Sequence, residues 1–312
     1  MQIFYSIKDL TNNKNTVLTL GTFDGIHPGH LKIIDRLVSS SKERGCRNVV
    51  ITFYPHPRTI LGNDNSVKML TTQIEKIKLL EKLGVENLLI IKFTKEFASL
   101  SAEDFIYDYL INGIGLTEIV LGHDHHFGKG RRGNAELLKK IGDKESFVVT
   151  KAEAFMVDGE AVSSTKIRNA LLEGNITRAN KLLGRNYEFS GVVVGGDKRG
   201  RELGFPTANI KLSSQEKLLP ASGVYAVKVK VENENHIGLL SIGKRPTFYS
   251  EGELVSEVYI YDFNREIYGA EVTTELVERL RGEQKFSSAE ELIKQMNKDK
   301  ENGYKVFNKS NN

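Results

Sequence analysis

The chain has 312 residues, of which 44 are basic and 40 are acidic, so its formal charge is +4. This length is enough for two domains with cores of their own, and the mild charge suits anionic small molecules without indicating a nucleic-acid partner. The single cysteine, Cys46, excludes an intrachain disulfide and a thiolate metal cluster. Because no signal peptide or apolar run of membrane-spanning length is visible, we expect a cytoplasmic protein.

Strands and helices alternate through the first half of the chain. β-Branched and apolar runs predict strands at residues 17–20, 48–54, 88–93, 118–121 and 147–150. Apolar residues at helical spacing predict helices between them, at residues 31–38, 72–83, 101–111 and 135–141. The second helix begins with a capping box from Thr72 to Glu75 and is expected to turn Ile74 and Leu80 inward. The alternation predicts a Rossmann-like, doubly wound parallel sheet that binds ligands beyond the carboxyl ends of its strands.

The hydrophobic period changes near residue 185. Two short helices, at residues 165–172 and 178–183, come before the change. After it, apolar residues recur at every second position, which predicts strands at residues 191–195, 223–231, 236–242 and 257–263. Only the end, from Ser288 onward, again has helical spacing. We therefore expect a compact antiparallel β-barrel with a C-terminal helix, and a division into domains of residues 1–184 and 185–312.

Residues 21–30, GTFDGIHPGH, form a glycine-rich turn between a predicted strand and a predicted helix. Such a turn directs backbone N–H groups and the positive end of the helix at one spot, which makes an anion site. His27 and His30 stand at its rim and are able to donate hydrogen bonds to phosphate oxygens. The alternative is an ordinary turn with two exposed histidines, but the full pattern in this context favours a phosphate site.

A second phosphate-binding pattern lies at residues 162–168, VSSTKIR. Ser163, Ser164 and Thr165 precede a predicted helix and are suitable N-caps. Arg168 lies one turn into that helix and projects near the same N-terminus. Hydroxyl groups together with a guanidinium are suited to binding a polyphosphate.

Two loops that follow predicted strands carry histidines. His56 and Pro57 come after residues 48–54, where a structural role for the histidine is the alternative to ligand binding. His123, His125 and His126 follow residues 118–121 and suggest a zinc site, but on an extended turn their side chains point in different directions. We therefore expect no metal there. The basic residues of the same loop form either a solvated surface or a mobile phosphate clamp: Lys129, Arg131 and Arg132.

Residues 195–210, GGDKRGRELGFPTANI, are the main candidate for chemistry in the second half. Gly196, Gly200 and Gly204 permit a close approach of the backbone, but the segment lacks the lysine spacing and the following helix of a P-loop. Thr207 and Asn209 are oxygen donors on one face of an extended chain, which suits a hard cation such as Mg²⁺. The alternative is a glycine-rich loop that leads into a strand.

These patterns resemble those of known families. The pattern G-x-F-D-G-x-H-x-G-H and the pattern S-S-T-x-I-R resemble the FMN adenylyltransferase branch of the HxGH nucleotidylyltransferases. Residues 200–210 resemble the riboflavin kinase signature, which residues 243–248, 268–269 and 281–286 also fit. Over nearly its whole length the chain is therefore similar to the bifunctional prokaryotic riboflavin kinase/FAD synthetase family. The resemblance implies that ATP phosphorylates riboflavin to FMN and then adenylylates FMN to FAD with release of pyrophosphate.

The resemblance also implies roles for individual residues. Glu257 corresponds to the family's catalytic base in the kinase, and His27, His30 and Arg168 to catalytic residues of adenylyl transfer. The implied ATP- or phosphate-binding residues are Gly21, Phe23, Gly25, Gly29, Ser163, Ser164, Thr165, Gly196, Gly200, Gly204 and Pro206. The implied flavin-binding residues are His56, Pro57, Asp124, Phe127, Arg281 and Glu283, and the implied Mg²⁺ ligands are Thr207 and Asn209. His125 stands where the family usually has an aromatic residue, so no flavin-packing role carries over to it.

Two other interpretations are weighed against the bifunctional enzyme. In one, only the kinase is active and the first domain binds or regulates; the retained His27, His30, Ser164, Thr165 and Arg168 argue against it. In the other, the barrel binds single-stranded RNA, as some small β-barrels do. That function requires a basic groove with exposed aromatic residues, which the nearly balanced charge does not supply. We expect small-molecule partners, no nucleic acid or membrane, and a monomer or weak homo-oligomer.

Overall fold

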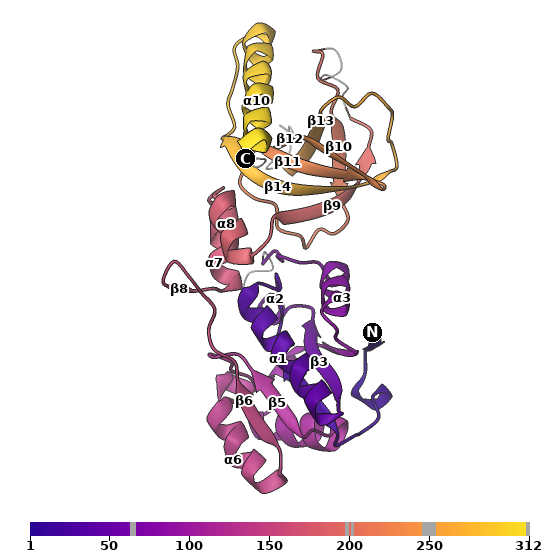
Figure 1. Cartoon of the computed structure of the whole chain (residues 1–312), viewed down its shortest axis with the longest axis vertical. Coiled ribbons are helices and arrows are strands. Elements are labelled where there is room, and N and C mark those ends of the chain that lie inside the picture. Colours follow the sequence, from indigo (N-terminus) through magenta and orange to yellow (C-terminus); the bar gives the residue numbers. More distant parts are fainter. Residues whose placement is uncertain (63–66, 197–199, 201–202, 245–253, 310–312) are drawn as a thin grey trace. The chain divides into compact units, whose positions relative to one another are not determined.

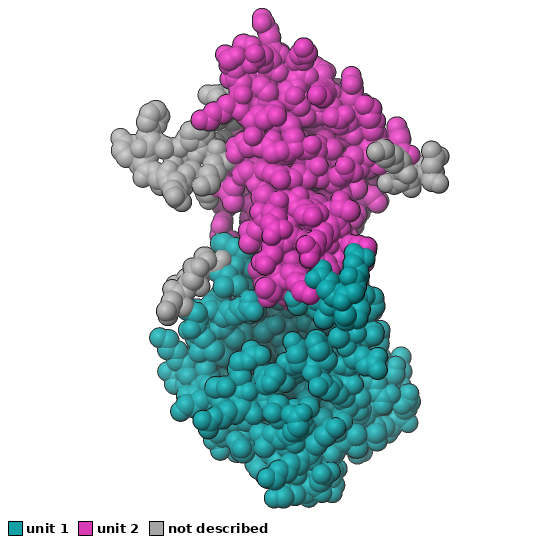
Figure 2. Space-filling view, turned by 90° about the vertical axis from the view of Figure 1, so that its left-hand side faces the viewer, with its two compact units in different colours: residues 1–163 teal, residues 164–312 magenta. Residues whose placement is uncertain are grey.

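The computed structural model describes residues 1–62, 67–196, 200, 203–244 and 254–309 (Figure 1). The chain divides into two compact units, Met1–Ser163 and Ser164–Asn312 (Figure 2), which we describe one at a time. Among the described residues, no helix combines the length and the apolar character that a membrane crossing requires.

The first unit is built around a parallel sheet. Its strands are β1 (Gln2–Phe4), β2 (Thr16–Leu20), β3 (Arg47–Tyr54), β4 (Asn87–Lys92), β5 (Glu118–Leu121) and β6 (Val148–Lys151). They lie in the order β1-β4-β3-β2-β5-β6, and every neighbouring pair is parallel. Strand β3, the next strand after β2 in the sequence, pairs with one edge of β2, whereas β5 pairs with its other edge. The predicted doubly wound parallel sheet is confirmed, with its switch point between β2 and β5.

Helices and short turns connect these strands (Figure 1). The helices of the first unit are α1 (Pro28–Arg44), α2 (Pro57–Leu61), α3 (Gln73–Lys82), α4 (Lys95–Ala98), α5 (Ala102–Asp104) and α6 (Ala135–Glu145). The 3-10 turns are η1 (Ile7–Asp9) and η3 (Lys129–Arg131), and a small hairpin pairs β7 (Met156–Val157) with β8 (Glu160–Ala161). The helix expected at residues 101–111 is α5 continued by η2 (Phe105–Ile114), which has π-helical hydrogen bonding.

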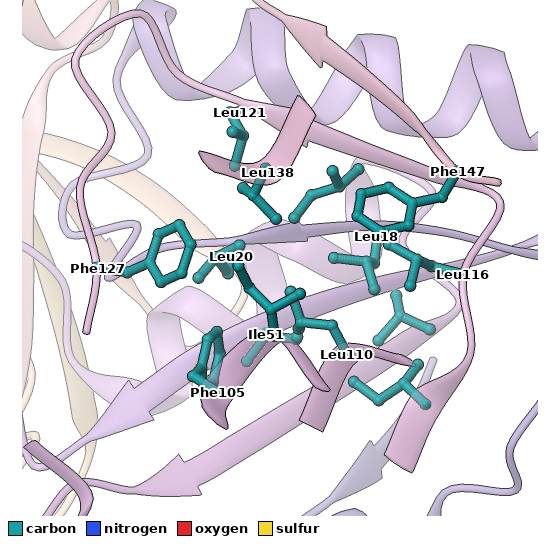
Figure 3. Close-up of a cluster of buried hydrophobic side chains, with 14 of the residues drawn as sticks. Leu18, Leu20, Ile51, Phe105, Leu110, Leu116, Leu121, Phe127, Leu138 and Phe147 are labelled. Carbon is teal, nitrogen blue, oxygen red and sulfur yellow. The ribbon is translucent and has the colours of Figure 1, made fainter. Parts of the chain in front are cut away.

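Apolar side chains cover both faces of the sheet. Successive residues of a strand point to opposite faces, so Val17 of β2 belongs to one buried cluster while Leu18 and Leu20 belong to the other. Figure 3 shows the second cluster, in which Leu18 and Leu20 lie among residues such as Phe105. Because β2 is buried on both faces, its sequence, TVLTL, contains no charged residue and does not alternate apolar with exposed polar positions.

One expectation about α3 is wrong. The capping box between Thr72 and Glu75 is formed as predicted, and Leu80 is fully buried. Ile74, however, is 66% exposed. It lies in the first turn of the helix, and only the later turns of α3 pack against the sheet, through Ile77 and Leu80.

A buried carboxylate at the amino end of β5 fastens the last turns of α1 to the sheet. Glu118, at the start of β5, is inaccessible to solvent and accepts hydrogen bonds from Ser40 and from Thr150 Oγ1 (2.7 Å). Arg44 Nε, in the last turn of α1, donates to it over 2.8 Å. Burial alone would raise the pKa of Glu118, but these hydrogen bonds and the charge of Arg44 lower it below the ordinary value. The carboxylate therefore stays ionised and orients α1.

The second unit begins with two helices, α7 (Ser164–Leu172) and α8 (Ile176–Leu183), and continues as a barrel. The strands are β9 (Tyr187–Val194), β10 (Ala208–Leu212), β11 (Gly223–Val231), β12 (Glu234–Lys244), β13 (Leu254–Ile260) and β14 (Glu271–Arg281). They close in the order β10-β13-β12-β11-β14-β9 with antiparallel pairs, and helix α10 (Ala289–Lys309) follows. The predicted antiparallel barrel with a C-terminal helix is confirmed.

Strand β14 was not predicted. Its inward residues Val272, Thr274 and Leu276 do alternate with exposed or half-buried ones. Glutamate, arginine and leucine, which are strong helix formers, fill most of the other positions. The local propensity of this segment therefore favours a helix, although its apolar pattern is that of a strand. Pairing with β9 and β11 overrides the helical propensity.

Helices α7 and α8 are attached to the barrel by specific contacts. Ala221 N donates to Leu171 O over 3.0 Å. Asn180 bridges the two parts, because its Nδ2 donates to Leu276 O (2.8 Å) and its Oδ1 accepts from Tyr187 N (2.8 Å). The second unit thus begins at Ser164, earlier in the chain than the change of hydrophobic period near residues 184–187.

Candidate functional site

The loop at residues 21–27 lies at the switch point of the parallel sheet. It follows β2, whose neighbours β3 and β5 are reached in opposite directions. The loop after β5, which begins at Gly122, lies at the same edge. Ligands of doubly wound sheets bind in the crevice outside the carboxyl ends at such a point. The fold therefore brings these two loops to one candidate site.

The backbone of the first loop is held in an uncommon conformation. Phe23 has φ of +46°, Gly25 of +87° and Ile26 of +39°, all in the left-handed region. For the two residues other than glycine this costs roughly 1–3 kcal/mol each, which only a strongly constraining environment maintains. Both side chains are 1% exposed, so their packing in the core fixes the conformation.

Asp24 fastens this loop to the segment before α3. Its buried carboxylate accepts hydrogen bonds from Leu70 N (3.2 Å) and Thr71 N (3.0 Å). The hydroxyl of Thr71 in turn accepts from Gly25 N over 3.1 Å. Sequence reasoning assigned no role to Asp24 or Thr71, although an aspartate between Phe23 and Gly25 is typical of a residue that orders a tight turn.

The two histidines of the loop lie face to face. His27 occupies the N-cap position of α1, and its ring stacks on that of His30 with centroids 3.7 Å apart and an interplanar angle of 17°. His30 Nδ1 is buried and has no hydrogen-bond partner among the described residues. Burial, followed by the charges of His27 and Lys76, lowers the pKa of His30 well below its ordinary value. His30 is therefore neutral near pH 7 and offers an N–H donor rather than a charge.

Two glycines of the motif make room for these rings. A Cβ at Gly29 would lie 3.2 Å from both Cε1 and Nδ1 of His27. A Cβ at Gly21 would lie 3.2 Å from Cε2 of Phe23, whose ring meets His30 edge-on at 5.3 Å. The spacing of the motif thus serves the stacking of aromatic rings around the helix N-terminus.

The histidines after β5 do not converge. His123 Nδ1 lies 3.6 Å from Asp124 Oδ1, and His126 Nδ1 lies 2.8 Å from Asp124 O. His125 turns the other way and stacks on Phe127, with centroids 6.0 Å apart. Within the described ranges, no three His, Cys, Asp or Glu side chains form a group that could hold a metal.

His125 is the least exposed of these three histidines. Burial lowers its pKa to about 4, and its Nε2 has no hydrogen-bond partner in the part of the chain that the structure describes. Its neighbour Phe127 is buried and extends into the aromatic cluster through Phe105, 5.6 Å away. His56 has a local contact, because its Nδ1 accepts from Arg58 N (3.1 Å) and caps α2 ahead of Pro57.

Ser163, Ser164, Thr165 and Arg168 lie at the beginning of α7, as their spacing predicts. Ser163 is the last residue of the first unit, and the other three begin the second. Arg168 is 9% exposed.

In the second unit, a cavity of about 300 Å³ opens between β9, β10 and β13. Thr207 Oγ1 donates to Glu257 Oε2 over 3.1 Å, and Asn209 lies directly opposite Glu257 in the pairing of β10 with β13. The predicted residues that line this cavity are Gly196, Gly200, Pro206, Thr207, Asn209 and Glu257. The fold therefore brings together residues that lie far apart in the sequence.

Each of the three glycines in this segment occupies a position where a side chain would clash or would require an unfavourable backbone angle. A Cβ at Gly196 would overlap the side-chain amide of Asn209, and one at Gly200 would overlap the carbonyl of Phe205. Gly204 has φ of +83°, which residues with a side chain rarely adopt. The segment thus folds closely over Thr207 and Asn209. Residues 197–199, 201–202 and 245–248, which belong to the predicted motifs, lie outside the described residues.

Arg281 and Glu283 are not among the described residues that line this cavity. Arg281 lies at the end of β14 and pairs with Asp299 of α10, with Nη2 2.8 Å from Oδ2. Glu283 lies close to Gly243 of β12, because a Cβ built there would be 2.9 Å from its Oε1.

Comparison with known proteins covers both units. The sequence model of a family described as FAD synthetase matches residues 9–166, and that of a family described as riboflavin kinase matches residues 183–307. A bifunctional riboflavin kinase/FMN adenylyltransferase from Bacillus subtilis (strain 168) is 41% identical over 295 residues, which are 94% of this chain and 92% of the relative. A relative of the same description from Escherichia coli (strain K12) is 36% identical over 302 residues, which are 96% of each chain.

One solved structure is similar over both units. It comes from Streptococcus pneumoniae, is described as a macrolide-efflux protein, and is 35% identical with a TM-score of 0.87. The similarity covers 96% of this chain and 97% of that one. Neither matching family model nor either curated relative above carries that description.

Proposed function

Because the chain belongs to the family of bifunctional riboflavin kinase/FMN adenylyltransferases, we propose that its two candidate sites each carry out one of the two reactions. The protein is a riboflavin kinase and FMN adenylyltransferase: it converts riboflavin to FMN and then FMN to FAD, with ATP as co-substrate. The observation that carries the assignment is the match of different family models to residues 9–166 and 183–307. Incubation with riboflavin, ATP and Mg²⁺, followed by chromatography of the flavins, tests it directly.

For adenylyl transfer we propose the loop after β2 as the place where ATP phosphates bind. In this reaction the FMN phosphate attacks the α-phosphorus of ATP and pyrophosphate leaves, so no general base is needed. Alignment and stabilisation of charge on the phosphoryl oxygens supply the catalysis. His27 and His30 donate hydrogen bonds there, together with the N-terminus of α1. Arg168 belongs to the second unit, and we propose it, from its own motif, as a further group that binds ATP phosphates.

The remaining assignments at this site are proposals of the same kind. The backbone around Gly21, Phe23, Gly25 and Gly29 binds phosphate oxygens. The hydroxyls that precede Arg168 are proposed, from their own motif, to bind ATP phosphates as well. The hydroxyls are those of Ser163, Ser164 and Thr165. We propose that the flavin lies toward the loops after β3 and β5, whose candidate residues are His56, Pro57, Asp124 and Phe127. The position of these loops at the carboxyl ends of β3 and β5 supports this, because ligands of doubly wound sheets bind at that edge.

For the kinase we propose Glu257 as the base. It accepts the proton of the primary ribityl hydroxyl while that oxygen attacks the γ-phosphorus of ATP and ADP leaves. The close-packed segment around Gly196, Gly200, Gly204 and Pro206 binds the ATP phosphates through its backbone. Arg281 and Glu283 form the flavin-binding segment at the end of β14. The approach of Glu283 to Gly243, on a strand that pairs with the strand of Glu257, supports this assignment.

The donor set near Glu257 fits Mg²⁺. Thr207 Oγ1 and the Glu257 carboxylate are 3.1 Å apart, and Asn209, opposite Glu257 in the strand pairing, lines the same cavity. These are hard oxygen donors, few in number, as is typical of sites where substrate phosphates complete the coordination of magnesium. We propose Thr207 and Asn209 as its protein ligands. When bound, Mg²⁺ would neutralise charge on the phosphates.

We expect Thr207→Ala and Asn209→Ala each to lower FMN formation by roughly two orders of magnitude, because metal stabilisation of phosphoryl charge is worth several kcal/mol. A higher Mg²⁺ concentration should restore part of the rate. Steady-state kinetics with a magnesium titration measures both effects. Thr273→Ala is the matched control, because that hydroxyl pairs with Ser190 away from the cavity. FMN production at the wild-type rate by both variants would contradict the assignment.

We propose residues 1–184 as the adenylyltransferase domain and 185–312 as the kinase domain. A fragment of residues 184–312 should then fold and phosphorylate riboflavin. A fragment of residues 164–312 should be more stable by roughly 3 kcal/mol, because burying each of Ile176 and Leu182 contributes about 1.5 kcal/mol or more. Urea unfolding followed by circular dichroism compares the two. Equal free energies of unfolding would mean that α7 and α8 do not stabilise the barrel, and an inactive short fragment would contradict the domain boundary.

The setting of the enzyme is also a proposal. Both reactions consume ATP, which supports a cytoplasmic location. We propose that the enzyme acts on riboflavin, FMN and ATP as a monomer or weak homo-oligomer, without a nucleic-acid or membrane partner.

A further inference from the structure

An ion pair joins Arg281, the first residue of the proposed flavin-binding segment, to Asp299 of α10. Arg281 Nε is 3.1 Å from Asp299 Oδ1 and 2.9 Å from Oδ2, and Nη2 is 2.8 Å from Oδ2. The Arg281 side chain is 17% exposed and that of Asp299 is 4% exposed. This two-pronged contact fixes the plane of the guanidinium as well as its position.

The remaining contacts of the Arg281 guanidinium are with residues of the loop that follows it. Nη1 donates to Gly282 O over 3.0 Å, and the cation lies above the ring of Phe286 at 5.8 Å. All three nitrogens of Arg281 thus have partners within the protein. The arginine is thereby occupied as an anchor, and Glu283, which is exposed, is the side chain that the loop presents.

The strand register relates Glu283 to Glu257. Glu257 lies opposite Ser241 in the pairing of β13 with β12, and Gly243 is two residues beyond Ser241. Residues two apart on a strand share a face and are separated by roughly 7 Å. Glu283 covers Gly243, so its carboxylate is on the same face of the barrel wall as Glu257.

Helix α10 is held rigidly enough to act as a support. Gln295 Nε2 donates to Asp299 Oδ1 over 2.8 Å from one turn earlier in the helix. One turn later, the ring of Tyr304 stacks on Tyr261 with centroids 4.3 Å apart, and Tyr261 Oη donates to Lys300 O. Gln295 thus orients the Asp299 carboxylate within the helix, and the contacts of Tyr261 hold the helix against the barrel.

We propose that Asp299 is a positioning residue of the riboflavin kinase reaction. Through Arg281 it sets the loop of residues 281–286 so that Glu283 faces riboflavin beside Glu257, and Asp299 itself touches no substrate. This inference rests on the proposed function, since it assigns the support of the proposed flavin-binding segment.

The test is the kinetics of Asp299→Asn in the full chain. The amide keeps the shape of the side chain but loses the charge that orients Arg281. We expect KM for riboflavin to rise roughly tenfold or more, since displacement of a positioned group by about 1 Å can cost up to a hundredfold. KM for ATP in the kinase reaction and the adenylylation of supplied FMN should stay unchanged. Asp299→Glu should restore part of the riboflavin affinity.

Two further variants separate positioning from simple loss of stability. Tyr304→Phe removes the hydrogen bond from Tyr304 Oη to Asp262 (3.2 Å) and leaves the ion pair intact, so it should lower stability without changing KM for riboflavin. If Asp299→Asn does not fold by circular dichroism, Arg281→Lys serves instead, because it keeps the charge but loses the two-pronged contact; it should raise KM for riboflavin alike.

A lower melting temperature of Asp299→Asn with unchanged KM for riboflavin would overturn the proposal, and so would an equal effect on KM for ATP. A wild-type protein that forms no FMN would instead overturn the proposed function.

Discussion

Glu257→Gln is expected to stop riboflavin phosphorylation and to leave the conversion of supplied FMN to FAD unchanged. Loss of a general base typically costs roughly two to four orders of magnitude in rate. The structure makes the substitution a clean one, because a glutamine can still accept the hydrogen bond that Thr207 Oγ1 gives to the carboxylate over 3.1 Å. The side chain is half-buried on a paired strand, so the neutral amide fits without a change of shape.

Two flavin assays measure this outcome. Chromatography with riboflavin and ATP reports the kinase, and the same assay with FMN and ATP reports adenylylation. Glu278→Gln is the matched control, because Glu278 is an exposed glutamate on β14 that pairs with Ala226 and does not line the cavity. Loss of both activities in folded Glu257→Gln would favour a single shared site, and normal phosphorylation would remove Glu257 from the mechanism.

The double substitution of His27 and His30 by alanine is expected to have the opposite effect. FMN should accumulate from riboflavin and not proceed to FAD. Removing one donor that stabilises developing charge typically costs about two to three orders of magnitude, and here two stacked rings are removed together. Because burial lowers the pKa of His30 well below its ordinary value, we attribute the loss of rate to a missing N–H donor rather than to a missing cation.

This variant needs a test of folding, since both rings pack at the N-terminus of α1. Circular dichroism and the retained kinase rate provide it. His236→Ala is the control, because His236 is a histidine of the second unit that contacts Glu234 and does not line the kinase cavity. An unchanged FAD yield from the double variant would exclude the loop after β2 as the site of adenylyl transfer.

The architecture could be predicted from the sequence where a strong period agrees with local propensity. The buried run of β2 and the alternation in β11 are of this kind, and both lie where expected. Strand β14 could not be recognised, since its helix-forming residues concealed the alternation. Ile74 was misplaced because a helical pattern does not reveal where along its length the helix meets the sheet.

The candidate sites were predictable as motifs but not as contacts. The sequence contained Asp24, yet its carboxylate binds Leu70 and Thr71, more than forty positions away, and only the fold brings them together. The same holds for Arg281, whose partner Asp299 belongs to a helix with no motif of its own. A motif identifies which side chains are present. Their orientation depends on residues elsewhere in the chain, which no local sequence pattern identifies.

The left-handed backbone at Phe23, Gly25 and Ile26 has a consequence for the entropy of binding. Fixing the backbone of one residue costs about 1–2 kcal/mol in lost conformational freedom. If the loop became ordered only when a ligand bound, ordering these three residues would weaken the binding free energy by that amount. Here core packing has already fixed them. The loss therefore lowers the stability of the first unit. The nucleotide that we propose to bind here would meet a loop whose conformation is already set.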